Sequence, residues 1–178
     1  MRDLDLERNI IIHFSGKDEK IRHMITIETE RLFLYPISDE EMQTIIDNEK
    51  DPEMKKAYSE MLQGCLDSPK DRVWYATWNM ELKNEPETIV GDLCFKGITD
   101  DGMVEIGYGL KEGYCGNGYM TEAVRAMTEW AISQDKVSRV EAETDPDNKP
   151  SMNVLEKVGF IPTGEMGEEG PRFVFAGN

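Results

Sequence analysis

The sequence is poor in basic residues, in cysteine and in long apolar runs. Its 178 residues carry 20 Lys and Arg against 36 Asp and Glu, a formal net charge of −16. Such a chain repels the phosphate backbone of a nucleic acid, so we expect no nucleic-acid partner. No stretch approaches the ~20 consecutive apolar residues that a membrane-spanning helix needs, so we expect no membrane association. The first residues also lack the basic segment and apolar core of a secretion signal.

Three cysteines, Cys65, Cys94 and Cys115, form no Cys-x-x-Cys pair, and only 2 histidines accompany them. A disulfide framework and a zinc site are therefore not expected, and we predict no metal. A reducing, cytoplasmic setting is the default for such a chain. No histidine lies close to Cys115 in the sequence to activate it as a nucleophile, so we interpret Cys115 as a loop residue.

The remaining composition is that of a globular protein, with 39% apolar and 31% charged residues. The length favours one domain. Residues 1–24 pair a short apolar run with a polar, turn-like stretch, and we interpret them as an N-terminal extension. We expect residues 25–178 to form a single domain.

Local patterns divide this region into strands and helices. Alternation of apolar and polar residues predicts strands, and helical spacing predicts helices. Ser38 and Glu41 have the spacing of a capping box, and Asp101-Gly102 marks a hairpin turn. The predicted strands cover residues 31–36, 73–82, 88–98, 103–110 and 137–144, and two closing strands are predicted on either side of a turn at residues 168–171. The predicted helices cover residues 42–46, 54–65, 119–134 and 149–158.

A glycine-rich turn at residues 113–118 joins a predicted strand to a predicted helix. A helix start leaves backbone N–H groups unpaired and carries the positive end of the helix dipole, so it suits an anion such as a phosphate. Gly116 and Gly118 permit close approach of a ligand to the backbone. The turn lacks the Gly-Lys-Ser/Thr of nucleotide hydrolases, and Thr121 replaces the third glycine of the dinucleotide motif. An ordinary turn is the alternative interpretation.

Three segments in order, 105–108 (EIGY), 116–123 (GNGYMTEA) and 148–160 (NKPSMNVLEKVGF), resemble the GNAT superfamily of acyl-CoA-dependent N-acetyltransferases. Within it they look like the branch of ribosomal-protein-alanine N-acetyltransferases. The resemblance runs from about residue 29 to about residue 175. It implies an α+β fold whose mixed, mostly antiparallel sheet is splayed at the cofactor and flanked by about four helices.

The resemblance implies acetyl-CoA as the acyl donor. The strand before the turn is expected to pair with the pantetheine arm, and the turn is expected to hold the pyrophosphate. Cys115 and Met120 depart from the family pattern, which has Arg or Gln and a small residue there. The implied cofactor residues are Tyr108, Gly109, Leu110, Cys115, Gly116, Asn117, Gly118, Tyr119, Met120, Thr121 and Asn148.

Acyl transfer to an amine requires removal of a proton, since a lysine-type amine has a pKa of about 10.4. A carboxylate acting directly or through water suits that role. By resemblance, Glu105 and Glu143 match positions of the general base in different members. Each position also fits a solvent-exposed strand residue without a catalytic role.

A tyrosine that reprotonates the leaving thiolate in many relatives is replaced here by Leu155. Ser151 is the substitute that the resemblance suggests. It also fits an ordinary polar residue in the first turn of a helix.

The resemblance implies an N-acetyltransferase that passes an acetyl group to a primary amine, on a protein N-terminus or a small molecule, by direct attack on the thioester. A non-catalytic acyl-CoA-binding or interaction module on the same fold is one alternative, and transfer of another acyl group is a second. The acidic composition favours a cationic acceptor amine, and a homodimer is common among relatives.

Overall fold

The computed structural model describes residues 25–177, and its centre is an 8-stranded sheet in the order β1-β2-β3-β4-β5-β6-β8-β7. Neighbouring strands are antiparallel except β5 and β6, which are parallel. This confirms the mixed, mostly antiparallel sheet. The predicted N-terminal extension lies outside the described residues. The strands are β1 (Ile27–Glu28), β2 (Leu32–Pro36), β3 (Thr77–Leu82), β4 (Ile89–Ile98), β5 (Met103–Leu110), β6 (Arg139–Glu143), β7 (Ile161–Met166) and β8 (Pro171–Phe175).

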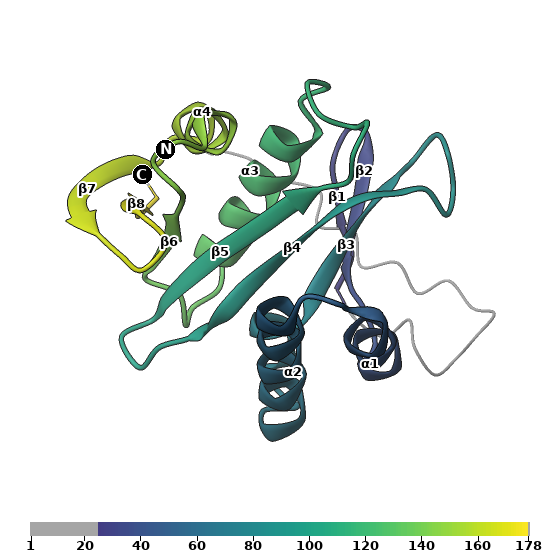
Figure 1. Ribbon diagram of the computed structural model, residues 1–178. Helices are drawn as coiled ribbons and strands as arrows, with labels where there is room; N and C mark the ends of the chain where they lie inside the picture. The colour runs from purple at the N-terminus through teal and green to yellow at the C-terminus, as the bar shows by residue number, and fades with distance from the viewer. Residues whose placement is uncertain (1–24, 178) are drawn as a thin grey trace, which may run out of the picture.

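Helices cover both faces of the sheet (Figure 1). Helices α1 and α2 lie on one face, and α3 lies on the other with α4 beside it. The Ser38–Glu41 capping box predicted for α1 is confirmed, and Asn148 caps α4. No helix in residues 25–177 combines the length and apolar character that crossing a membrane requires. The helices are α1 (Asp39–Asn48), α2 (Pro52–Asp67), α3 (Tyr119–Ile132) and α4 (Lys149–Val158).

An aromatic cluster fixes α3 against the sheet. Trp130 of α3 stacks on Trp74 with ring centroids 5.0 Å apart. It also contacts Trp78 of β3 at 5.2 Å and Phe95 of β4 at 6.2 Å. Aromatic side chains bury the largest apolar areas, so this cluster anchors the C-terminal end of α3 to the sheet.

Strands β5 and β6 separate partway along their length. Their parallel pairing covers only Met103 to Glu105 on β5, whereas β5 stays paired with β4 as far as Leu110. The N–H of Lys111 donates to Val90 at 2.8 Å, so by alternation the peptide groups of Tyr108 and Leu110 point to the opposite edge. That edge is open, as the resemblance implied.

Two predicted strands differ from the structure at their starts. The strand expected from residue 73 begins at Thr77, because η1 (Arg72–Trp74) turns the chain so that Trp74 meets Trp130. The strand expected over residues 31–36 begins at Leu32, after a turn in which Thr29 donates its N–H to the carbonyl of Leu32 at 3.0 Å. Strand β1, before that turn, was not predicted. Apolar residues continue from Val73 to Ala76, so the sequence does not reveal the break before β3.

Helix α2 runs to Asp67, inside the stretch 64–69 where the sequence predicted its end. A Cβ on Gly64 would lie 2.4 Å from the ring of Tyr75. The glycine is therefore required for close packing of that ring and does not terminate the helix.

Candidate active site

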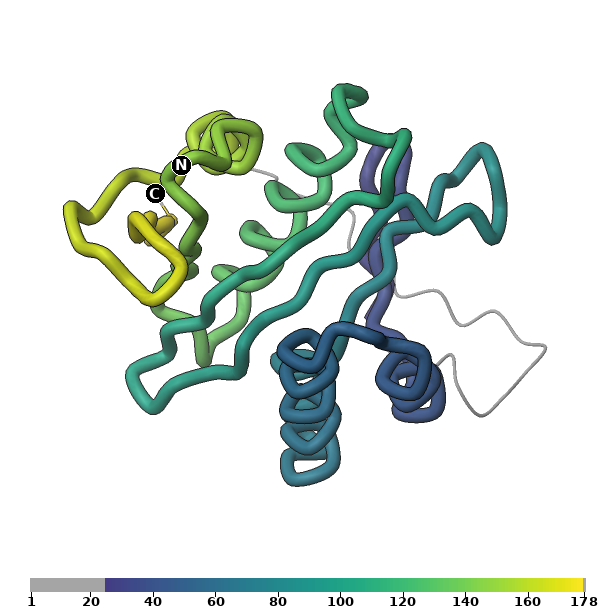
Figure 2. Tube along the Cα trace, in the orientation of Figure 1, coloured from purple at the N-terminus to yellow at the C-terminus, as the bar shows by residue number. Residues whose placement is uncertain are grey.

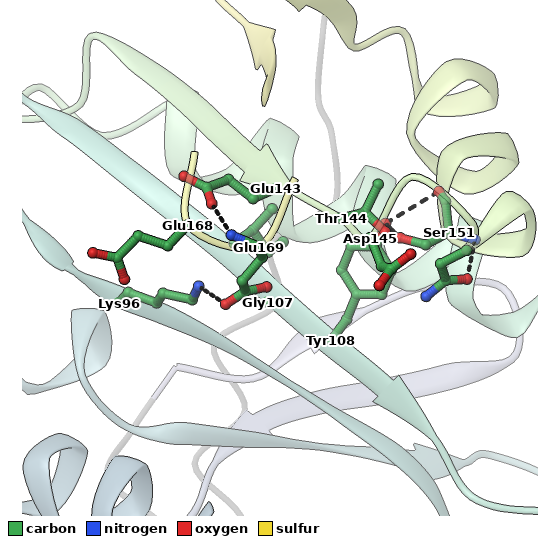
Figure 3. Close-up of a pocket in the computed structure, with 11 residues that line it drawn as sticks. Lys96, Gly107, Tyr108, Glu143, Thr144, Asp145, Ser151, Glu168 and Glu169 are labelled. Atoms are coloured by element: carbon green, nitrogen blue, oxygen red, sulfur yellow. Dashed lines mark hydrogen bonds and ion pairs between the residues drawn. The ribbon is translucent and has the colours of Figure 1, made fainter. Parts of the chain in front are cut away.

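A pocket of about 530 Å³ opens where β5 and β6 separate (Figure 3). One end lies against the start of α4, and the other lies beneath the loop between β7 and β8. The pocket brings together residues that the sequence separates by more than sixty positions. It is lined by Lys96, Ile106, Gly107, Tyr108, Glu143, Thr144, Asp145, Asn148, Ser151, Glu168 and Glu169.

The glycine turn has the backbone that an anion site needs. Gly116 has φ 81° and Gly118 has φ 80°, a left-handed conformation that favours glycine. Gly118 is the N-cap of α3, and no side chain caps the helix there. Asn117 closes the turn by donating its side-chain amide to the carbonyl of Tyr114 at 3.1 Å. The first amides of α3 are thus left for another partner.

The predicted cofactor residues differ in exposure. Of those in the turn, Cys115, Gly116, Asn117 and Gly118 are exposed. Met120 is only 5% exposed and packs in the core, which accounts for an apolar side chain at a position where the family pattern has a small residue. Tyr108 and Asn148 line the pocket. Residues 113–121, which form the glycine turn and the start of α3, are not part of its lining.

Ser151 lies beside the side chain of Tyr108. The Oγ of Ser151 is 3.0 Å from the phenolic oxygen of Tyr108, and the phenol also donates to the Ser151 carbonyl at 3.3 Å. Burial raises the pKa of Tyr108, partly offset by the contact with Ser151, so the phenol stays protonated at neutral pH. The carboxamide oxygen of Asn148 accepts from the N–H of Ser151 at 3.1 Å and fixes the start of α4.

Glu105 lies next to the pocket but does not line it. Its Oε1 is 2.5 Å from the Nζ of Lys96, and its Oε2 is 3.9 Å from Arg172. Its side chain is 14% exposed. Lys96, its partner, does line the pocket.

Glu143 is more enclosed, with a side chain that is 4% exposed. One oxygen pairs with Arg172, and the other accepts from the N–H of Glu169 at 3.0 Å. Burial raises the pKa of Glu143, but the contacts with Glu169 and Arg172 outweigh it and hold the pKa below its usual value. A Cβ on Gly167 would lie 2.0 Å from this carboxylate. Glu143 thus packs directly beneath the β7–β8 loop.

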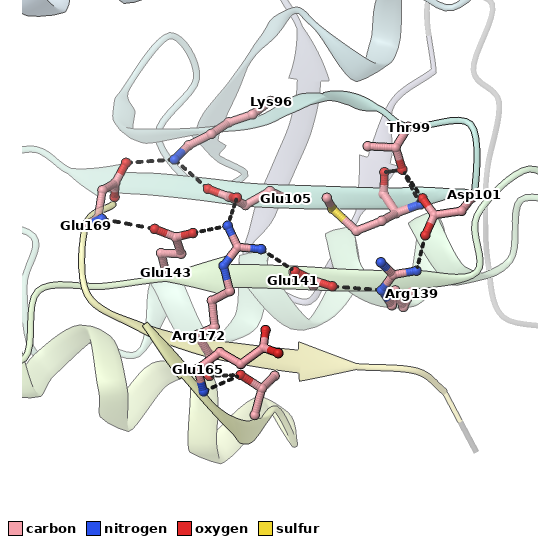
Figure 4. A network of polar contacts seen from close by, with 12 residues as sticks. Lys96, Thr99, Asp101, Glu105, Arg139, Glu141, Glu143, Glu165, Glu169 and Arg172 are labelled. Carbon is pink, nitrogen blue, oxygen red and sulfur yellow. Dashed lines mark hydrogen bonds and ion pairs between the residues drawn. The ribbon is translucent and has the colours of Figure 1, made fainter. Parts of the chain in front are cut away.

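Arg172 joins the three acidic strand residues into one network (Figure 4). It lies 3.0 Å from Glu141 and also contacts Glu143 and Glu105. Lys96 extends the network to the loop by pairing with Glu169 at 2.7 Å. Burial lowers the pKa of Lys96, but its two carboxylate partners outweigh this and raise the pKa above its usual value.

Sequence reasoning did not identify Lys96, Arg172, Glu169 or the phenol of Tyr108 as site residues. Alternation along β4 places Lys96 on one face, but only the register between strands shows that Glu105 is its neighbour. Arg172 reaches the site because β8 inserts between β6 and β7. Neither relationship has a local signal in the sequence.

The residues present fit an acyl-CoA. The open edge of β5 offers peptide groups to an extended amide-containing arm, and the glycine turn beyond it offers amides to a diphosphate. Within residues 25–177, no three His, Cys, Asp or Glu side chains are grouped to hold a metal ion.

Comparison with known proteins identifies the family. A family model described as an acetyltransferase (GNAT) domain matches residues 20–161. This chain belongs to that GNAT acetyltransferase family. A Bacillus subtilis relative, the uncharacterized N-acetyltransferase YjdG, is 39% identical over 88 residues, which cover 49% of this chain and 52% of the relative. The match thus spans about half the length of that relative.

Two further GNAT comparisons cover more of the chain. The uncharacterized N-acetyltransferase p20 of Bacillus licheniformis is 26% identical over 152 residues, 79% of this chain and 85% of the relative. The solved structure of RimL, a ribosomal L7/L12 α-N-protein acetyltransferase in complex with coenzyme A, superimposes with a TM-score of 0.66 at 16% identity, over 85% of this chain and 97% of that one. The chain therefore has the GNAT fold.

Proposed function

We propose that this GNAT-family chain is an acetyl-CoA-dependent N-acetyltransferase whose acceptor is a primary amine, on a protein N-terminus or a small molecule. One observation carries the proposal. Strand β5 leaves β6 after Glu105 and continues along an open edge toward the glycine turn at the start of α3. The chain thus offers first the peptide groups of β5 to an extended pantetheine arm and then the amides of the glycine turn to the phosphates.

In this proposal the donor lies along β5 and reaches the turn. The peptide groups of Tyr108 and Leu110 face the open edge and would bind the pantetheine arm. The amides of residues 116–121 would bind the diphosphate, and Asn148 at the start of α4 would contact the donor from the other side. When bound, acetyl-CoA supplies an activated acyl group with a thiolate as its leaving group.

Glu105 is the proposed general base. It accepts a proton from the acceptor ammonium, directly or through a water, and so frees the nitrogen for attack on the acyl carbon. Glu143 remains the second candidate, but its contacts with Arg172 and with the N–H of Glu169 lower its pKa, which makes it a weaker base. Those contacts suit a residue that fixes the β7–β8 loop.

Ser151 is the proposed acid. As the bond between acyl carbon and sulfur breaks, Ser151 donates its hydroxyl proton to the thiolate and is reprotonated from solvent. The phenol of Tyr108, 3.0 Å away, positions the Ser151 hydroxyl at the pocket wall. The nitrogen loses two protons on becoming an amide: Glu105 takes the first and passes it to solvent, then takes the second, while solvent returns one proton to Ser151, so the proton changes balance.

The charge of the pocket supports a cationic acceptor. Asp145, Glu168 and Glu169 line it together with Glu143, whereas Lys96 is the one basic residue in the lining. An ammonium group would be attracted to this wall. The α-amino acceptor named for the RimL structure is one candidate. A homodimer stays a prediction, which light scattering on the purified chain checks.

Calorimetric titration with acetyl-CoA, and separately with CoA, tests the proposal first. We expect one-to-one binding with a Kd in the micromolar range. An alanine-starting peptide, a polyamine and an aminoglycoside are then assayed for release of the CoA thiol, with propionyl-CoA as a second donor. No binding would overturn the proposal, and binding without release in an extended amine panel would favour the non-catalytic alternative.

A further inference from the structure

The backbone trace shows the turn between β1 and β2 close to the glycine turn (Figure 2). Arg31 lies in that β1–β2 turn, and its side chain contacts the glycine turn. Its Nη1 donates to the carbonyl of Asn117 at 2.9 Å. Its guanidinium lies 4.5 Å from the centre of the Tyr119 ring. A Cβ on Gly118 would lie 3.5 Å from its Nη2. One side chain from a distant hairpin thus touches three consecutive residues at the start of α3.

The same hairpin holds Glu122, in the first turn of α3. The Nε of Arg31 is 2.7 Å from Oε2 of Glu122, and the backbone N–H of Arg31 donates to Oε1 at 2.8 Å. The hydroxyl of Thr29 donates to Oε1 at 2.6 Å. Glu122 is only 18% exposed on its side chain. Three donors from one hairpin therefore lock the start of α3.

This arrangement matters for an anion at the turn. A carboxylate one turn into α3 would repel a diphosphate bound at the same helix start, unless its charge were paired. Residues 113–118 (GYCGNG) contain no cation of their own. Arg31 pairs with Glu122, and its side chain is still 41% exposed. It thus places positive charge where the turn has none.

We propose that Arg31 is the positioning residue of the glycine turn. It holds the turn through Asn117 and Tyr119, and it neutralises Glu122 beneath the site of the donor's diphosphate. The inference rests on the proposed function, since the diphosphate arrives only with an acyl-CoA. The inference assigns a role at the donor site to a residue that lies outside the glycine turn and far from it in sequence.

Kinetics with two acyl donors distinguish this role from a general contribution to folding. Acetyl-CoA carries the nucleotide diphosphate, whereas S-acetylpantetheine lacks it and still occupies the open edge of β5. In Arg31→Met we expect KM for acetyl-CoA to rise roughly tenfold or more, from the loss of charge-assisted hydrogen bonds. KM for S-acetylpantetheine and kcat with either donor should stay within about twofold.

Lys83 offers a matched control. Its Nζ lies 3.1 Å from Glu28 and 5.0 Å from the centre of the Phe33 ring, so it pairs and stacks as Arg31 does, but both of these partners lie outside the glycine turn. Lys83→Met should leave the KM ratio of the two donors unchanged. Adding Glu122→Gln to Arg31→Met should recover part of the acetyl-CoA affinity, because the unpaired charge is removed.

The outcomes are distinct. An equal effect of Arg31→Met on both donors, or none on either, overturns this inference while leaving the proposed function intact. Failure of the wild-type chain to bind CoA in calorimetry overturns both. Should Arg31→Met not fold, Arg31→Lys keeps the charge but loses the planar fork, and a selective rise in KM for acetyl-CoA is again expected.

Discussion

The ammonium of Lys96 lies 2.5 Å from Glu105 and 2.7 Å from Glu169, so one side chain joins the middle of the sheet to the loop before β8. Lys96 lines the pocket, and the Glu105 carboxylate, outside the lining, pairs with it. The proposed base is therefore held in place from the pocket side. An acceptor ammonium that approaches the pocket meets this basic residue among several acidic ones.

Replacing Glu105 by Gln should lower kcat by roughly a hundredfold, since general base catalysis contributes about that factor or more. Acetyl-CoA affinity should change little, because Glu105 is not at the glycine turn. The measurement is steady-state kinetics with an acceptor found in the amine panel. Glu141→Gln is the control, since Glu141 is the register partner of Glu105 and its side chain is similarly buried, at 11% exposed. Equal losses in both variants would remove Glu105 from the mechanism.

Ser151→Ala should lower kcat by roughly tenfold or more if its hydroxyl protonates the thiolate. Tyr108→Phe should have a smaller effect of the same kind, because it removes only the group that orients Ser151 at 3.0 Å. Asn153→Ala, an exposed change on the same helix, controls for helix stability. A Ser151→Ala enzyme with wild-type kcat would leave the serine as an ordinary residue of the first turn.

Glu143 should contribute stability that depends on pH. Its folded-state pKa is lowered, so its contribution is present above the usual glutamate pKa and is lost as pH falls through the lowered value. Urea unfolding of wild type and Glu143→Gln at about pH 7 and about pH 4 measures this. The difference in free energy of unfolding should shrink at the acidic pH. A constant difference would mean that packing beneath Gly167, and not charge, accounts for the role of Glu143.

Gly116→Ala should separate backbone strain from donor binding. Gly116 and Gly113 both have positive φ, and a Cβ added at either would meet no other residue within 4 Å. Alanine at either position should therefore cost about 1 kcal/mol of stability, from backbone strain alone. Only Gly116 lies where the diphosphate is expected, so only Gly116→Ala should also weaken CoA binding in calorimetry. Equal CoA affinities in the two variants would contradict the assignment of the turn.

Much of the local structure followed from the sequence alone. The bounds of β5, the capping box of α1 and the start of α3 after Gly118 all depend on residues close together in the chain. The motif order also led to the correct family and fold. Such features are predictable because alternation, capping and glycine conformation act over a few residues.

The tertiary structure decided the rest of the site. The separation of β5 from β6, the reach of Arg172 from β8 and the contact of Arg31 with Glu122 all join segments far apart in sequence. These depend on strand order and register, which the aromatic packing around Trp130 helps to fix. The sequence by itself determined which elements form and which family they belong to, whereas only packing between distant elements determined which charged side chains meet at the pocket.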